Sequence, residues 1–182
     1  MKRIGNQTYQ LEKNIYLIKG VSLVGRKEGD GPLHSYFDFI EKDDKMGEKT
    51  FEKGERKMFF KAISECIKKS GINKGEIDLY VGGDLMNQLV SSNYAASELE
   101  IPFLGLYNAC ATMAESYIIG STFLESGGFK NIVCATGSHF STAERQYRYP
   151  LEFGNQRQSY AQWTVTGVGA TVLSTKSNSN VK

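Results

Sequence analysis

A single cysteine occupies the place in this sequence that is best suited to chemistry. Cys110 follows the apolar run Ile101–Tyr107, which has the length of a strand, and precedes a helix-like pattern that reaches Ser126. A thiol at that junction would lie beside the unpaired N–H groups at the positive end of a helix, an environment typical of nucleophilic cysteines. The alternative is that Cys110 is a small apolar residue packed at a tight turn. The local pattern leaves both interpretations open.

Polar residues follow three of the expected strands. Asp84 comes after the first of them, Cys110 after the second and His139 after the third. In sheets that alternate with helices, ligands bind beyond the carboxyl ends of the strands. We therefore expect Asp84, Cys110 and His139 to meet at one edge of the sheet.

The segment from residue 141 to residue 158 is rich in arginine and tyrosine. It contains Arg145, Arg148 and Tyr149 within five residues. An arginine fork binds carboxylates in a bidentate manner, and a tyrosine ring offers a flat wall to an aromatic ligand. The alternative is that these arginines are solvated and pair with Glu144 and Glu152.

Hydrophobic periodicity predicts the elements that position these residues. The order from residue 50 onward is helix, strand, helix, strand, helix, strand, which indicates an α/β layered fold with a mostly parallel sheet flanked by helices. We expect one lobe over residues 1–173 and a polar tail over residues 174–182. Expected strands span residues 14–24, 77–81, 101–107, 131–137 and 163–173, and expected helices span residues 50–70, 85–99 and 110–126.

Composition narrows the class of protein. The chain has 182 residues, a net charge of +2 and 40% hydrophobic residues, which is enough for a packed core. Its basic residues are dispersed, so we expect no nucleic-acid partner. Three cysteines without metal-like spacing indicate free thiols and a reducing compartment, with no metal and no cofactor. Cys66 and Cys134 fall on apolar patterns and are expected in the core. We expect a soluble cytoplasmic protein.

The segment Asn108-Ala109-Cys110-Ala111 resembles the nucleophile turn of the thiolase and β-ketoacyl synthase superfamily. Within that superfamily, the flanking segments resemble the stage V sporulation protein AD family of spore-forming bacteria. The similarity extends in order over nearly the whole chain. It rests on Gly29–Leu33, Gly83–Gln88, Asn93–Ala96, Ile101–Leu104, Ser138–His139, Thr142–Pro150 and Thr164–Gly167.

This resemblance implies a thiolase-like sporulation protein that binds dipicolinic acid, free or as its calcium complex. It also implies work beside membrane proteins of the same sporulation operon, so the surface of the spore inner membrane is the alternative location. The resemblance does not imply an established catalytic activity. The candidate ligand-binding residues are Asp84, Asn87, Asn93, Cys110, His139, Arg145, Arg148 and Tyr149.

Two other functions remain open. The first is an acyltransferase that uses Cys110 as nucleophile with a partner chain to complete the site, and the second is a scaffold that binds no small molecule. The superfamily fold is a duplicated pair of halves, and this chain resembles the first half alone. The only histidines are His34 and His139, so a complete catalytic set cannot be assembled within the chain. We therefore expect a homodimer or a separate second-lobe partner.

Overall fold

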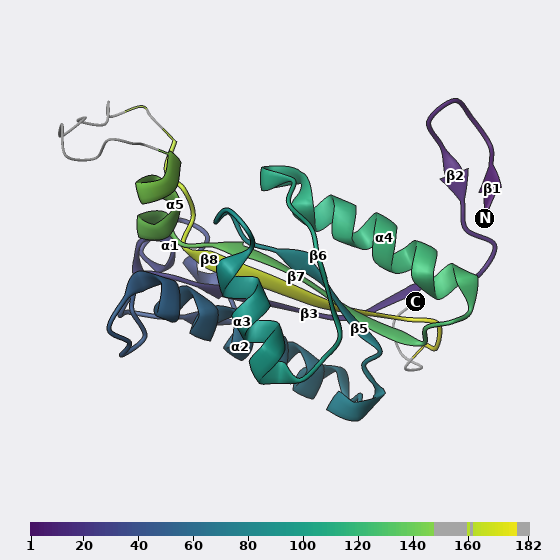
Figure 1. The fold of residues 1–182 in the computed structure, drawn as a ribbon, viewed down its shortest axis with the longest axis horizontal. Helices are drawn as coiled ribbons and strands as arrows, with labels where there is room; N and C mark the ends of the chain where they lie inside the picture. Colours follow the sequence, from purple (N-terminus) through teal and green to yellow (C-terminus); the bar gives the residue numbers. More distant parts are fainter. Residues whose placement is uncertain (148–159, 161, 178–182) are drawn as a thin grey trace.

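A six-stranded sheet forms the centre of the computed structural model (Figure 1), which describes residues 1–147, 160 and 162–177. The strand order is β4-β3-β8-β7-β5-β6, and β1 pairs with β2 in a separate antiparallel hairpin. Only β8 runs antiparallel to its two neighbours, so five of the six strands share one direction. The strands are β1 (Lys2–Arg3), β2 (Tyr9–Gln10), β3 (Tyr16–Val24), β4 (Phe39–Ile40), β5 (Leu79–Gly83), β6 (Phe103–Gly105), β7 (Asn131–Ser138) and β8 (Gly167–Ser174).

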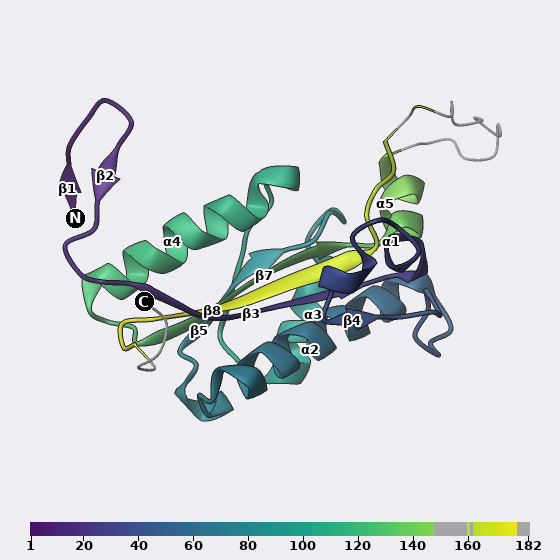
Figure 2. The same cartoon turned by 180° about the vertical axis from the view of Figure 1, so that it is seen from behind.

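Helices cover both faces of this sheet, as Figures 1 and 2 show from opposite sides. Helices α2 and α3 pack together and against one face, while α4 packs against β5, β7 and β8 from the other face. The predicted α/β layered fold with a mostly parallel sheet is confirmed. The helices are α1 (Arg26–Gly29), α2 (Phe51–Ser70), α3 (Val90–Leu99), α4 (Thr112–Ser126) and α5 (Phe140–Tyr147), and short 3-10 turns span His34–Tyr36, Lys74–Glu76 and Ala109–Ala111.

Local signals account for the bounds of α2. The Thr50 hydroxyl accepts the N–H of Lys53 at the start of the helix, and Gly71 ends it with a left-handed φ of 74°. These are the usual N-cap and C-cap arrangements of helices. The apolar stripe of α2, which includes Phe59 and Cys66, is fully buried against the sheet. The helix predicted over residues 50–70 is therefore confirmed.

The sheet separates two hydrophobic cores. The larger core lies between the sheet and α2 with α3, and it includes the buried ring of Tyr80. The smaller core lies between the sheet and α4, and it includes Leu124 and Cys134. Side chains of β5 and β7 enter both cores, as expected for central strands with apolar residues on both faces. The expected core positions of Cys66 and Cys134 are confirmed.

The helix predicted over residues 85–99 begins five residues later than expected. The Asp84 carboxylate accepts the N–H of Met86 at 2.9 Å and the N–H of Ser92 at 2.7 Å. The chain between them turns through Gln88 and Leu89, whose φ angles are 68° and 56°. Because Asp84 engages these N–H groups, residues 85–89 form a loop and α3 starts at Val90.

The two ends of the described chain lie away from the carboxyl end of the sheet. The β1–β2 hairpin is tied to α4 by the Glu125 carboxylate, which accepts the N–H groups of Glu12 and Lys13. Strand β8 ends at Ser174, and the expected polar tail lies outside the described residues from residue 178 onward. Among the described helices, none combines the length and the apolar character needed to cross a bilayer.

Candidate functional site

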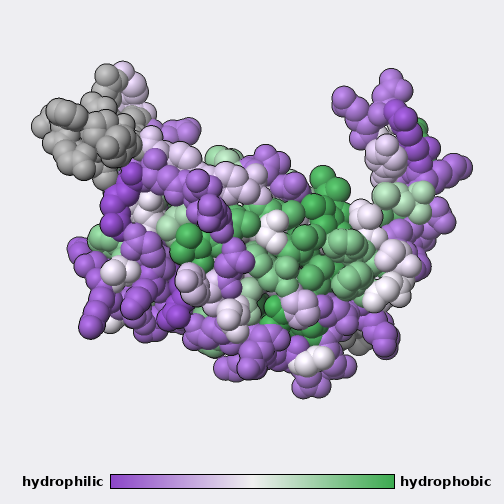
Figure 3. Space-filling view, viewed as in Figure 1, coloured by the Kyte–Doolittle hydropathy of each residue, from purple (hydrophilic) through white to green (hydrophobic). Residues whose placement is uncertain are grey.

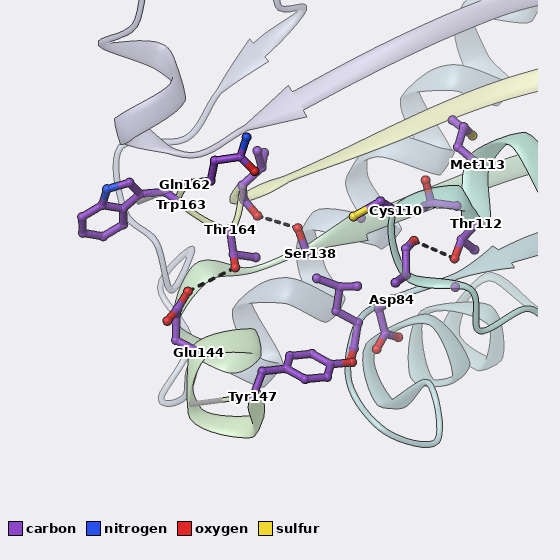
Figure 4. Close-up of a pocket in the computed structure, with 16 residues that line it drawn as sticks. Asp84, Cys110, Thr112, Met113, Ser138, Glu144, Tyr147, Gln162, Trp163 and Thr164 are labelled. Atoms are coloured by element: carbon purple, nitrogen blue, oxygen red, sulfur yellow. Dashed lines mark hydrogen bonds between the residues drawn. The ribbon is translucent and has the colours of Figure 1, made fainter. Parts of the chain in front are cut away.

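A cavity of about 630 Å³ opens at the carboxyl ends of β5 and β7. Its walls come from the loop after β5, the turn before α4, the end of β7, helix α5 and the segment that leads into β8 (Figure 4). This is the edge at which the sequence predicted a ligand site. The described lining residues are Gly83, Asp84, Leu85, Ala109, Cys110, Thr112, Met113, Thr136, Gly137, Ser138, Glu144, Tyr147, Gln162, Trp163, Thr164 and Val165.

Cys110 lies in the 3-10 turn that joins β6 to α4, where the sequence placed it. The preceding residue, Ala109, has a φ of 45°, which turns the chain sharply. Thr112 stabilises the turn, because its hydroxyl donates to the carbonyl of Ala109 at 2.9 Å and accepts the N–H of Asn108 at 3.1 Å. The Cys110 thiol is exposed and faces the cavity (Figure 4). The described cavity wall contains no histidine that could act as its base.

Asp84 also lines the cavity, but its carboxylate already accepts hydrogen bonds from other groups of the protein. It is only 3% exposed and accepts the hydroxyl of Ser92 at 2.6 Å, in addition to the N–H groups that end the loop before α3. Burial raises the pKa of Asp84, and the hydrogen bonds from Ser92 and Met86 oppose this effect. Asp84 therefore fixes the floor of the cavity and contributes negative charge to it.

Helix α5 forms a wall that is latched to the loop after β5. The Tyr147 hydroxyl donates to the carbonyl of Leu85 at 2.6 Å and contacts the Tyr107 hydroxyl. The Gln146 side chain accepts the N–H of Asn87 at 2.8 Å. Partial burial, with the Tyr107 contact as the next cause, raises the pKa of Tyr147 to about 12. Tyr147 is thus a neutral hydrogen-bond donor at neutral pH, and its ring borders the cavity (Figure 4).

Four of the predicted ligand-binding residues are not among the described residues that line this cavity. His139 is 1% exposed, accepts the N–H of Ser141 at its Nδ1 and contacts the carbonyl of Asp44 through Nε2. Burial lowers the pKa of His139. Its Nδ1 accepts a hydrogen bond and is therefore unprotonated, and both ring nitrogens are engaged with the backbone. The expected meeting of three polar groups is therefore limited to Asp84 and Cys110. The other three residues are absent from the cavity wall, namely Asn87, Asn93 and Arg145.

Two of the predicted residues bind other parts of the protein, and two lie in the part of the chain that is not described. Arg145 pairs with Glu52 at the start of α2. Asn93 donates to the backbone carbonyl of Leu89 at 2.8 Å. Arg148 and Tyr149 lie outside the described residues. Their predicted roles stay predictions.

Sequence reasoning missed a buried acid next to the cavity. Glu55 on α2 is fully buried, and desolvation raises its pKa to about 8, with the Asp84 charge as the second cause. The hydroxyl of Thr142 on α5 donates to its Oε2 at 2.8 Å. A sequence signal for this burial exists, because Glu55 precedes Phe59 by four residues and so falls on the apolar face of α2.

Comparison with known proteins decides the family. Residues 5–182 match the family described as Stage V sporulation protein AD. The chain belongs to the stage V sporulation protein AD family. Over 174 residues it is 41% identical to the stage V sporulation protein AD of Bacillus subtilis (strain 168). This alignment covers 96% of this chain and 52% of that protein. The resemblance inferred from the sequence motifs is confirmed, and the chain spans about half the length of this curated relative.

Solved structures support the thiolase-like fold. The chain aligns with 3-oxoacyl-[acyl-carrier-protein] synthase III from Aquifex aeolicus at a TM-score of 0.60 and 15% identity, over 91% of this chain and 55% of that one. It aligns equally well, at a TM-score of 0.60 and 13% identity, with an OleA variant from Xanthomonas campestris, over 91% of this chain and 57% of that one. At such identities the likeness concerns the fold alone.

Proposed function

We propose that this sporulation protein binds dipicolinic acid as its calcium complex in the cavity between Cys110 and Tyr147. In this role it assists uptake of the ligand into the developing spore beside membrane proteins of the same operon, at the cytoplasmic side of the spore inner membrane. The observation that carries the proposal is the cavity of about 630 Å³ at the carboxyl end of the sheet, in a chain of this family. That volume is within the range of small-molecule sites.

The charge of the described wall favours the calcium complex over the free acid. The ionisable side chains that line the cavity include the carboxyl group of Asp84, and the described lining contains no lysine or arginine. Dipicolinate carries two carboxylates, and like charges repel at short distance in a partly desolvated site. One calcium ion neutralises the dianion, and the complex can still stack its flat aromatic ring on Tyr147.

Calorimetric titration with calcium dipicolinate tests this site. We expect Tyr147→Leu to weaken binding at least tenfold, because it removes both the ring and the hydroxyl that latches α5 to Leu85. Tyr94→Leu is the matched control, since Tyr94 is 64% exposed on α3 and does not line the cavity. Cys110→Ala should stay within about tenfold of the wild type, or roughly 1.4 kcal/mol, because the proposal needs no covalent bond.

Two results would contradict the proposal. Equal binding of benzene-1,3-dicarboxylate, which has the same carboxylates without the chelating ring nitrogen, would mean that the calcium complex is not the ligand. Equal affinity in Tyr147→Leu and wild type would place the ligand elsewhere. Mass spectrometry after incubation with acyl-CoA addresses the acyltransferase alternative, since a covalent adduct on Cys110 would favour it.

The outer face of α4 supports a proposal about assembly. Ile118 on this face is 68% exposed, and Tyr9 of the neighbouring hairpin is 58% exposed. An apolar groove of about 620 Å³ lies between the hairpin and α4, and Figure 3 shows apolar residues gathered over this part of the molecule. Large exposed apolar patches mark interaction sites. We propose that a second copy of the chain packs on this face.

Sedimentation velocity measures the expected homodimer directly. At tens of micromolar we expect the wild type to sediment as a dimer and Ile118→Asp as a folded monomer, because a charge buried in an apolar interface lacks a partner. Tyr36→Asp, at a position that is 80% exposed and away from α4, should remain dimeric. A folded wild-type monomer at these concentrations would contradict the proposal.

A further inference from the structure

Helix α5 meets α2 at a buried carboxyl group, in addition to the contacts that Tyr147, Gln146 and Arg145 make with other parts of the protein. Glu55 projects from α2 and accepts the Thr142 hydroxyl of α5 at 2.8 Å through Oε2. Its other oxygen, Oε1, has no hydrogen-bond partner among the described residues. Thr142 is itself only 3% exposed. The same short helix carries Glu144 and Tyr147, which line the cavity, so this junction sets the position of the cavity wall.

The charges around Glu55 do not neutralise an ionised carboxylate. Asp84, after β5, and Glu52, one turn earlier on α2, both raise its pKa, while hydroxyl groups on α3 and α5 oppose them. Arg145 of α5 is engaged with Glu52, and Arg56 of α2 is engaged with Glu98. The ring of His139 at the base of α5 is neutral and held by the backbone. Glu55 is therefore buried among hydroxyl groups and other acids.

We propose that Glu55 is a positioning residue, which as a neutral acid holds α5 against α2 and α3 and on ionisation releases α5 and loosens the cavity wall. A buried carboxylate without a cation is strongly disfavoured, so ionised Glu55 must gain access to water. Helix α5 has only eight residues, and short elements open at low free energy, so we expect α5 to be the part of this junction that moves. The effect on ligand binding rests on the proposed function, whereas the release of α5 does not.

Hydrogen exchange of the α5 amides tests the release of this helix without any ligand. Labelling between pH 6.5 and 9.5, with times rescaled for the pH dependence of intrinsic exchange, should show protection of residues 140–147 falling at least tenfold up to about pH 8 and staying level above it. In Glu55→Gln, which keeps the size and hydrogen-bonding capacity of the side chain, protection should stay constant. The matched control is Glu65→Gln, at a partly exposed position of α2, which should behave as the wild type.

A second variant keeps the test decisive if Glu55→Gln folds poorly. Thr142→Val removes the hydroxyl that Glu55 accepts without changing the size of the side chain, so α5 should already be less protected at pH 6.5. The proposal is overturned if α5 protection in the wild type does not depend on pH, if Glu55→Gln loses protection as the wild type does, or if Thr142→Val leaves protection unchanged.

Titration of calcium dipicolinate over the same pH range separates this proposal from the proposed function. Wild-type affinity should fall about tenfold between pH 6.5 and about pH 8 and level off above it, and the affinity of Glu55→Gln should not change. If neither protein binds the complex at any pH, the proposed function fails while the exchange experiment still decides the role of Glu55. If both bind with an affinity independent of pH, the link between Glu55 and the cavity wall is wrong.

Discussion

Gly82→Ala should destabilise the protein by more than about 4 kcal/mol, or prevent folding, because a Cβ has no room at this position. An added Cβ would lie 1.8 Å from the carbonyl oxygen of Ala135, a backbone atom of the paired strand β7. Gly82 also has a φ of 157°, a conformation that residues with a side chain rarely adopt. Relief would require β5 and β7 to separate at the end of the sheet that bears the cavity. Chemical denaturation monitored by circular dichroism measures the loss.

The control for this prediction is a glycine in open space. Apart from its own local backbone, no described atom lies within 4 Å of a Cβ built on Gly75, so Gly75→Ala should change the unfolding free energy by about 0.5 kcal/mol or less. A Gly82→Ala protein as stable as Gly75→Ala would show that β5 and β7 do not approach each other so closely.

The free energy of unfolding should decrease by roughly 3–5 kcal/mol between pH 4.5 and pH 8 through the ionisation of Glu55 alone. Burial raises the pKa of this group to about 8 in the folded protein from an ordinary value of 4.5. Between these values the folded state holds a proton that the unfolded chain releases, so stability is greatest below about pH 4.5, falls as pH rises and is level above about pH 8. Urea denaturation at several pH values measures this slope.

Comparison with Glu55→Gln isolates the contribution of this residue. Burial lowers the pKa of His139, which gives an opposing increase in stability as pH rises through its ordinary value of 6.5. Hydrogen bonds lower the pKa of Asp43, whose stabilising effect is lost only in acid. Both contributions are common to the two proteins, so the wild type should lose stability relative to Glu55→Gln as pH rises. A constant difference would contradict the prediction.

The sequence by itself determined the order of the elements and the place of the thiol. Helix α2 was predictable because its cap at Thr50, its stop at Gly71 and its apolar spacing are all local features. The position of Cys110 between a strand and a helix followed from the same kind of pattern. The short motifs on either side of this residue also indicated the correct family, because each of them is contiguous in the chain.

Only the tertiary structure decided how these elements are joined and which side chains share a site. Strand β8 enters the sheet between β3 and β7 and runs antiparallel to both, a pairing that depends on contacts between residues far apart in the chain. His139 follows a strand as predicted, but the packing of residue 44 against it turns its ring into the protein. Glu55 acquired its burial from α3 and α5, which lie more than thirty residues away. Local periodicity cannot contain such information, because burial and hydrogen bonding at these sites are set by segments distant in sequence.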